Sequence, residues 1–89
     1  MKCTITFRNL DHTEALDNKI KTKSEKLTKF LGPEATIKWV CWVEKKKQYA
    51  EAIVAHKSNS FIAKAESEDL YKTMDIVLDK ISGQIEHAR

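Results

Sequence analysis

The sequence predicts one α/β domain of two layers with the element order β-α-β-β-β-α, in which two helices pack on one face of a four-stranded mixed sheet. Four segments alternate apolar and polar residues as half-buried strands do, and two segments repeat apolar residues with helical spacing. Only three of the 89 residues are glycine or proline, which excludes a flexible or low-complexity chain. We assign residues 1–89 to a single domain, because a chain of this length has no room for two cores.

The strands are expected at residues 2–8, 36–44, 49–57 and 61–66. A basic loop at residues 45–48 and a turn at residues 58–60 separate the last three strands. The first two strands can form a right-handed parallel crossover around the first helix, and the last three can form an antiparallel meander.

The first helix is expected from about residue 13 to residue 30. Asp11 or Thr13 can cap its start, and Gly32 followed by Pro33 is typical of a helix end. Its apolar stripe is formed by Leu16, Ile20, Ser24, Leu27 and Leu31.

The second helix is expected to follow a cap at Ser67, with Glu68 and Asp69 at its positive end. Gly83 interrupts this helix at a cost of about 1 kcal/mol relative to alanine. The apolar stripe is formed by Leu70, Met74, Val77, Leu78, Ile81 and Ile85.

Both helices are expected on the sheet face that carries Ile5, Cys41, Val54 and Ala63. The opposite face then remains open and carries Val40, Trp42, Ile53 and Ile62. Two interpretations of these apolar residues stay open: a contact surface for bases or protein, including weak self-association through Trp42, or ordinary strand propensity. Otherwise we expect a monomer.

The charge is unevenly distributed along the chain. The formal net charge is +3, but residues 19–64 hold eleven lysines against four acids, a balance of +7. Residues 66–86 hold six acids against two lysines, a balance of −4. A domain polarised in this way can present a basic face to an anionic partner, and Lys19, Lys23 and Lys26 flank the stripe of the first helix. A solvated helix face is the competing interpretation.

Motifs of catalysis and metal binding are missing from the sequence. The histidines His12, His56 and His87 fall in no nucleophile or metal motif, and Cys3 and Cys41 form no CxxC pair. We therefore expect a binding protein without catalytic residues, cofactor, metal or small-molecule substrate. The sequence shows no signal peptide or long apolar run, so we expect a cytoplasmic protein without a membrane partner.

The order and spacing of several short motifs resemble the ribosome hibernation promoting factor family, also called ribosome-associated inhibitors or sigma modulation proteins. The resemblance covers nearly the whole chain without gaps. Its most specific part is Glu68-Asp69-Leu70-Tyr71 through Met74-Asp75 to Asp79-Lys80. The other motifs are residues 2–8, Thr13-Glu14-Ala15-Leu16, Lys23 with Lys26-Leu27, Val43-Glu44-Lys45, Ala50-Glu51-Ala52 and Ala63-Lys64-Ala65.

The resemblance implies a protein that binds the small ribosomal subunit in its mRNA and tRNA channel, through rRNA phosphates. Such a protein inhibits translation and stabilises idle ribosomes under stress or in stationary phase. The expected rRNA-binding residues are Arg8, Lys19, Lys23, Lys26, Lys80 and Arg89, with Lys45, Lys46, Lys47 and His87 as additional contacts. Gly83 and His87 stand at positions that are usually basic in the family, so this half of the interface departs from the pattern.

The chain resembles the short members, some of which act with a second small ribosome-modulating protein. The expected fold is also similar to that of double-stranded RNA-binding domains. Two other functions therefore stay open. One is binding of free double-stranded RNA, and the other is a protein-interaction module that uses the open sheet face.

Overall fold

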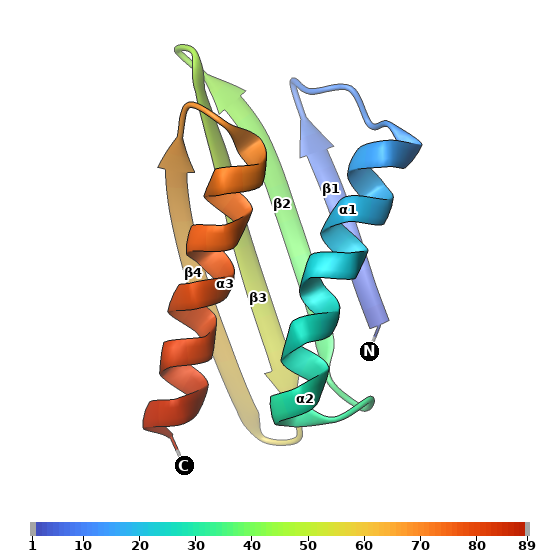
Figure 1. The fold of residues 1–89 in the computed structure, drawn as a ribbon, viewed down its shortest axis with the longest axis vertical. Coiled ribbons are helices and arrows are strands. Elements are labelled where there is room, and N and C mark those ends of the chain that lie inside the picture. Colours follow the sequence, from blue (N-terminus) through green and yellow to red (C-terminus); the bar gives the residue numbers. More distant parts are fainter. Residues whose placement is uncertain (1, 89) are drawn as a thin grey trace.

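The computed structural model describes residues 2–88 and shows the expected two-layer architecture (Figure 1). The elements are β1 (Lys2–Arg8), α1 (Glu14–Ser24), the 3-10 turn η1 (Glu25–Leu27), α2 (Thr28–Leu31), β2 (Thr36–Glu44), β3 (Lys47–His56), β4 (Asn59–Ser67) and α3 (Leu70–His87). The strands form one sheet in the order β1-β2-β3-β4. The β1–β2 pair is parallel and the other two pairs are antiparallel, which confirms the predicted mixed sheet.

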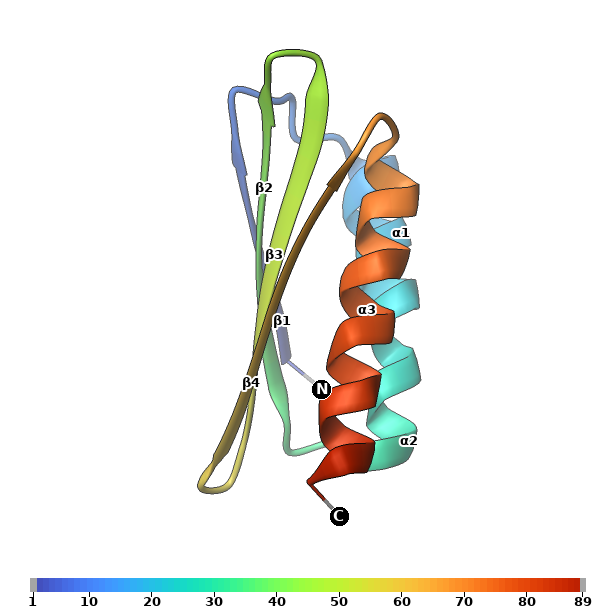
Figure 2. The same cartoon turned by 90° about the vertical axis from the view of Figure 1, so that its left-hand side faces the viewer.

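The helices cover one face of the sheet and leave the other uncovered (Figure 2). Strand alternation explains this layering, because Ile37, Trp39 and Cys41 on β2 are buried while Lys38 between them is exposed. Cys41, Val54 and Ala63 are buried beneath the helices, and Ile5 packs against this core. The predicted core face is therefore confirmed.

The first helical segment is less regular than predicted. Instead of one helix to residue 30, α1 ends at Ser24, and the chain continues through η1 into the short α2. The Ser24 hydroxyl donates to the Ile20 carbonyl at 2.7 Å, a back-bond known to perturb helices. Of the two caps considered, Thr13 is the N-cap, and its hydroxyl accepts from the Leu16 N–H at 3.1 Å.

The predicted cap of the second helix is wrong by two residues. The N-cap of α3 is Asp69, whose carboxylate accepts from the Tyr71 N–H at 3.2 Å. Because β4 extends through Ser67, that residue still belongs to the sheet, and its hydroxyl accepts from the Asp69 N–H. Glu68 and Asp69 therefore precede the helix.

Both hairpins are tighter than predicted. Lys45 and Lys46 alone form the β2–β3 turn, with φ angles of 49° and 67°, and Lys47 already pairs with Glu44. Positive φ at both central residues is the geometry that joins two twisted antiparallel strands most directly. The second hairpin closes at the pair His56–Asn59, so the predicted turn is displaced toward Lys57 and Ser58.

Candidate nucleic-acid interface

The cations Lys19 and Lys26 lie exposed on the first helical segment. Their neighbours Ile20 and Leu27 are fully buried, so the helical period turns these lysines away from the sheet. Neither lysine makes an ion pair with any residue between Lys2 and Ala88. Both ammonium groups are therefore free to attract an anionic partner.

Lys23 lies between the helices and is not free. Its side chain is 16% exposed, and its Nζ atom donates to Oδ1 of Asp75 on α3 at 2.7 Å. A largely buried side chain agrees with the flanking position that the sequence indicates. The carboxylate partner comes from 52 residues further along the chain.

Lys80 lies exposed on α3, where its ammonium is held at the edge of the sheet. Its Nζ atom donates to the Lys64 carbonyl on β4 at 2.9 Å, and Gln84 donates to the Ile62 carbonyl at 2.7 Å. Unpaired carbonyls of an edge strand otherwise invite another strand to pair with them. The two α3 side chains satisfy those carbonyls.

The C-terminal half of α3 carries Gly83 and His87, the two positions that we expected to depart from a basic pattern. A shallow hollow there is lined by Lys80, Gly83, Gln84, His87 and Ala88. A Cβ atom at Gly83 would meet no atom within 4 Å, so nothing inside the described chain requires glycine there. His87 is exposed at the end of the helix, and Arg89 lies outside the described residues.

The remaining expected cations form a separate group. Arg8 ends β1, while Lys45, Lys46 and Lys47 lie at the β2–β3 turn. This end of the sheet is the one at which α1 and α3 start, whereas α2 and the end of α3 lie at the opposite end (Figure 1). The expected site therefore divides into a helix group (Lys19, Lys23, Lys26, Lys80 and His87) and a strand-end group.

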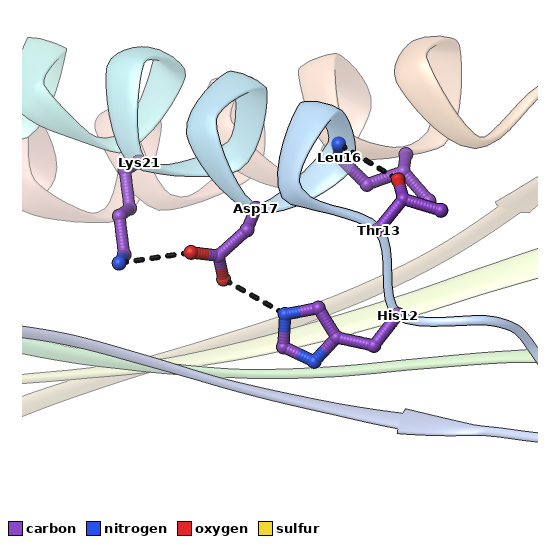
Figure 3. Close-up of polar contacts among 5 residues, drawn as sticks. All are labelled: His12, Thr13, Leu16, Asp17 and Lys21. Carbon is purple, nitrogen blue, oxygen red and sulfur yellow. Dashed lines mark hydrogen bonds and ion pairs between the residues drawn. The ribbon is translucent and has the colours of Figure 1, made fainter.

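Near the start of α1 lies a polar cluster that the sequence reasoning missed (Figure 3). The Asp17 carboxylate contacts Lys21 at 2.9 Å and His12 at 3.2 Å. The hydrogen bond from Lys21 is the main cause that lowers the pKa of Asp17, and the same bond raises the pKa of Lys21. The spacing of Asp17 and Lys21, one helical turn apart, could have revealed the pair, which removes Lys21 from the free cations.

On the open sheet face, Ile53 and Ile62 are register partners and are 37% and 54% exposed. Trp42 stacks on Tyr49, with ring centroids 5.2 Å apart and an interplanar angle of 6°. The Lys64 Nζ atom lies 5.6 Å from the Trp42 ring centroid, within the range of a cation–π contact. The predicted orientation of these residues is confirmed.

The His, Cys, Asp and Glu side chains between residues 2 and 88 form no group of three that could hold a metal ion. No helix in this range is long and apolar enough to span a bilayer.

A family model for the sigma 54 modulation protein / S30EA ribosomal protein matches residues 3–89. Among curated proteins, ribosome hibernation promoting factors from Azotobacter vinelandii and Salmonella typhimurium are both 31% identical over 85 residues. The matches cover 96% of this chain, with 79% of the Azotobacter protein and 90% of the Salmonella protein.

Solved structures have the same fold. The crystal structure of the Thermus thermophilus Protein Y N-terminal domain superposes with a TM-score of 0.93 at 27% identity, and each chain is covered completely. A ribosomal subunit interface protein from Coxiella burnetii gives a TM-score of 0.85 at 26% identity, over 99% of this chain and 97% of that one. Because the family model matches nearly the whole chain, this chain belongs to the sigma 54 modulation protein / S30EA ribosomal protein family.

Proposed function

We propose that the chain binds the small ribosomal subunit through rRNA phosphates, inhibits translation and stabilises idle ribosomes under stress or in stationary phase. The observation that carries the proposal is the pair of exposed, unpaired cations Lys19 and Lys26 on the helix layer of a fold shared with ribosome hibernation promoting factors. Charged contacts of this kind supply affinity for RNA without reading its sequence.

The proposed mechanism is steric. A rigid domain held by charge in the mRNA and tRNA channel occupies space that translation needs, and no chemical step is involved. The protein acts in the cytoplasm as a monomer, without cofactor, and a second small ribosome-modulating protein can act beside it.

The proposed contacts differ in strength. The ammonium groups of Lys19 and Lys26 make no ion pair with residues 2–88, whereas those of Lys23 and Lys80 already donate to protein acceptors. Arg8 and residues 45–47 would reach a different part of the rRNA, because they lie at one end of the sheet. The described end of α3 presents His87 rather than a lysine or arginine, and the Lys80 ammonium there already donates to a strand carbonyl, so we expect this end to contribute least.

The test is binding to isolated small subunits, measured by sedimentation through sucrose at low and moderate salt. We expect Lys19→Glu with Lys26→Glu to lower the affinity by about tenfold or more, since two phosphate contacts become repulsive. The matched control is Lys38→Glu together with Lys57→Glu, which changes the charge equally at exposed positions outside the helix layer.

Three outcomes would count against the proposal. Equal loss in both double variants would mean that only net charge matters, and unchanged binding of the helix-layer variant would remove these lysines from the interface. Equal affinity for isolated duplex RNA and for the subunit would favour a free double-stranded RNA-binding function instead.

A second candidate function is a protein contact through the open sheet face, which the exposed pair Ile53 and Ile62 favours. Light scattering tests self-association there. A mass that rises with concentration and returns to the monomer value in Trp42→Ala would support it, and a constant monomer mass would contradict it.

A further inference from the structure

The Lys23–Asp75 ion pair is the one ion pair that joins the two helices within residues 2–88. The other two ion pairs involve only residues 12–21 at the start of α1. Lys23 comes from the last turn of α1, and Asp75 comes from the second turn of α3. The pair therefore lies where the proposed interface passes from one helix to the other.

The two partners differ in their access to solvent. The Lys23 side chain is 16% exposed, whereas the Asp75 side chain is 49% exposed. An anion that approaches the Lys23 ammonium from solvent therefore meets a partly exposed carboxylate beside it. Like charges at this range repel, so the carboxylate offsets the attraction of Lys23 for an approaching phosphate.

We propose that Asp75 is a positioning residue for RNA binding, which holds the Lys23 ammonium between the helices and masks its charge until a phosphate takes the place of the carboxylate. The inference rests on the proposed function and deepens it. Lys19 and Lys26 attract any RNA at long range. Lys23 contributes only when a phosphate reaches between α1 and α3, so the pair favours RNA surfaces whose shape brings a phosphate there.

Removal of the carboxylate charge tests this masking. In Asp75→Asn no carboxylate competes with the phosphate for the Lys23 ammonium, so a phosphate contact that is only partly formed in the unmodified chain forms fully. We expect the affinity for the small subunit at low salt to rise by about fivefold, the equivalent of one exposed charge interaction. The slope of log affinity against log salt should steepen by up to about 0.9, the value for one added phosphate contact.

The matched control is Asp79→Asn. Asp79 lies one turn further along α3, is exposed, and makes no ion pair with residues 2–88. This variant removes the same charge from the same helix, so it reports the general effect of a less acidic α3. We expect a smaller gain in affinity and an unchanged salt slope.

Lys23→Gln, alone and combined with Asp75→Asn, separates masking from structural support. If Asp75 acts through Lys23, the change Asp75→Asn should lose its extra effect on the salt slope in the Lys23→Gln background. A purely structural pair would lower the melting temperature of Asp75→Asn without altering the slope.

The outcomes distinguish this inference from the proposed function. If the unmodified chain binds the subunit and Asp75→Asn behaves like Asp79→Asn, the masking role of Asp75 is overturned while ribosome binding stands. If Asp75→Asn keeps its steeper slope in the Lys23→Gln background, Asp75 does not act through Lys23. If the unmodified chain stays in the supernatant at both salt concentrations, the proposed function and this inference fail together.

Discussion

The two helices share one face of the sheet but are anchored to it by different means. Helix α3 runs for 18 residues and buries seven of them, whereas α1 runs for 11 residues and buries only Ile20 and Ser24. The free cations Lys19 and Lys26 lie on the α1–η1 segment, and the two cations of the long helix, Lys72 and Lys80, stand among the acids Asp75, Asp79 and Glu86. Anchoring and charge display are thus divided between the helices.

The difference shows how a small domain reconciles a basic surface with a small core. A helix with few buried residues can carry many lysines, but it needs another way to stay in place. Here Trp39, 1% exposed, donates its indole N–H to the Ser24 hydroxyl at 2.8 Å, and that hydroxyl donates to the Ile20 carbonyl. A buried polar link thereby fixes α1 to β2. Helix α3 instead combines its longer row of buried residues with hydrogen bonds from Thr73, Lys80 and Gln84 to strand carbonyls.

Among the substitutions that test this comparison, Ser24→Ala is expected to change the free energy of unfolding most. The substitution leaves the buried indole N–H of Trp39 without its acceptor, which should lower the free energy of unfolding by about 1–3 kcal/mol. Urea unfolding followed by tryptophan fluorescence measures the loss.

Ser82→Ala on α3 is the matched control, because Ser82 is half-buried and its side chain makes no hydrogen bond to the described residues. Alanine is the better helix former, so we expect a gain of a few tenths of a kcal/mol, about the difference in helix propensity. If both variants lose stability equally, the Ser24–Trp39 link is not what anchors α1.

Ser24 also illustrates which structural features could be predicted from the sequence and which could not. Periodicity places Ser24 on the apolar stripe of α1 and Trp39 on the buried face of β2, and both placements are confirmed. Their hydrogen bond depends on the crossing of α1 over β2, which local patterns do not encode. The 3-10 turn that follows Ser24 was also missed.

The candidate site was predicted less completely than the fold. Helical spacing correctly put Lys19, Lys23 and Lys26 beside the apolar stripe, but only the structure shows that Lys23 is half-buried while the other two are exposed. The partners of Lys23 and Lys80 are Asp75 and the Lys64 carbonyl, both distant in sequence, and only the assembled layers bring them together. Which lysines are free is therefore a property of the tertiary structure.

A smaller effect is expected from Gly83→Ala in the well-anchored helix. Because the added Cβ meets no atom within 4 Å and α3 runs through this position, alanine should raise the free energy of unfolding by about 1 kcal/mol. Thermal unfolding monitored by circular dichroism reports the gain.

Gly32→Ala is the contrasting variant. Its space is equally open, but its φ of +84° lies in a region that alanine adopts only with strain, so this change should destabilise the chain. A loss of stability in Gly83→Ala would mean that helix propensity does not govern this part of α3.

The smallest structural perturbation tests the centre of the sheet against its β1 edge. Its probes are the two free cysteines, Cys41 at the centre and Cys3 at the edge. Burial raises the pKa of Cys41 to about 11, and burial also raises the pKa of Cys3, which lines an open hollow with Lys21, Ser24 and Glu25. At pH 8 only about one Cys41 thiol in a thousand is the reactive thiolate.

We expect a thiol-specific disulfide reagent to modify the Cys41→Ser chain, which keeps Cys3, far faster than the Cys3→Ser chain, which keeps Cys41. Raising the pH toward 11 should narrow the gap, since more Cys41 thiolate forms, while urea should abolish it. Equal rates at pH 8 in the folded chains would show that the layer over Cys41 opens as readily as the edge beneath α1.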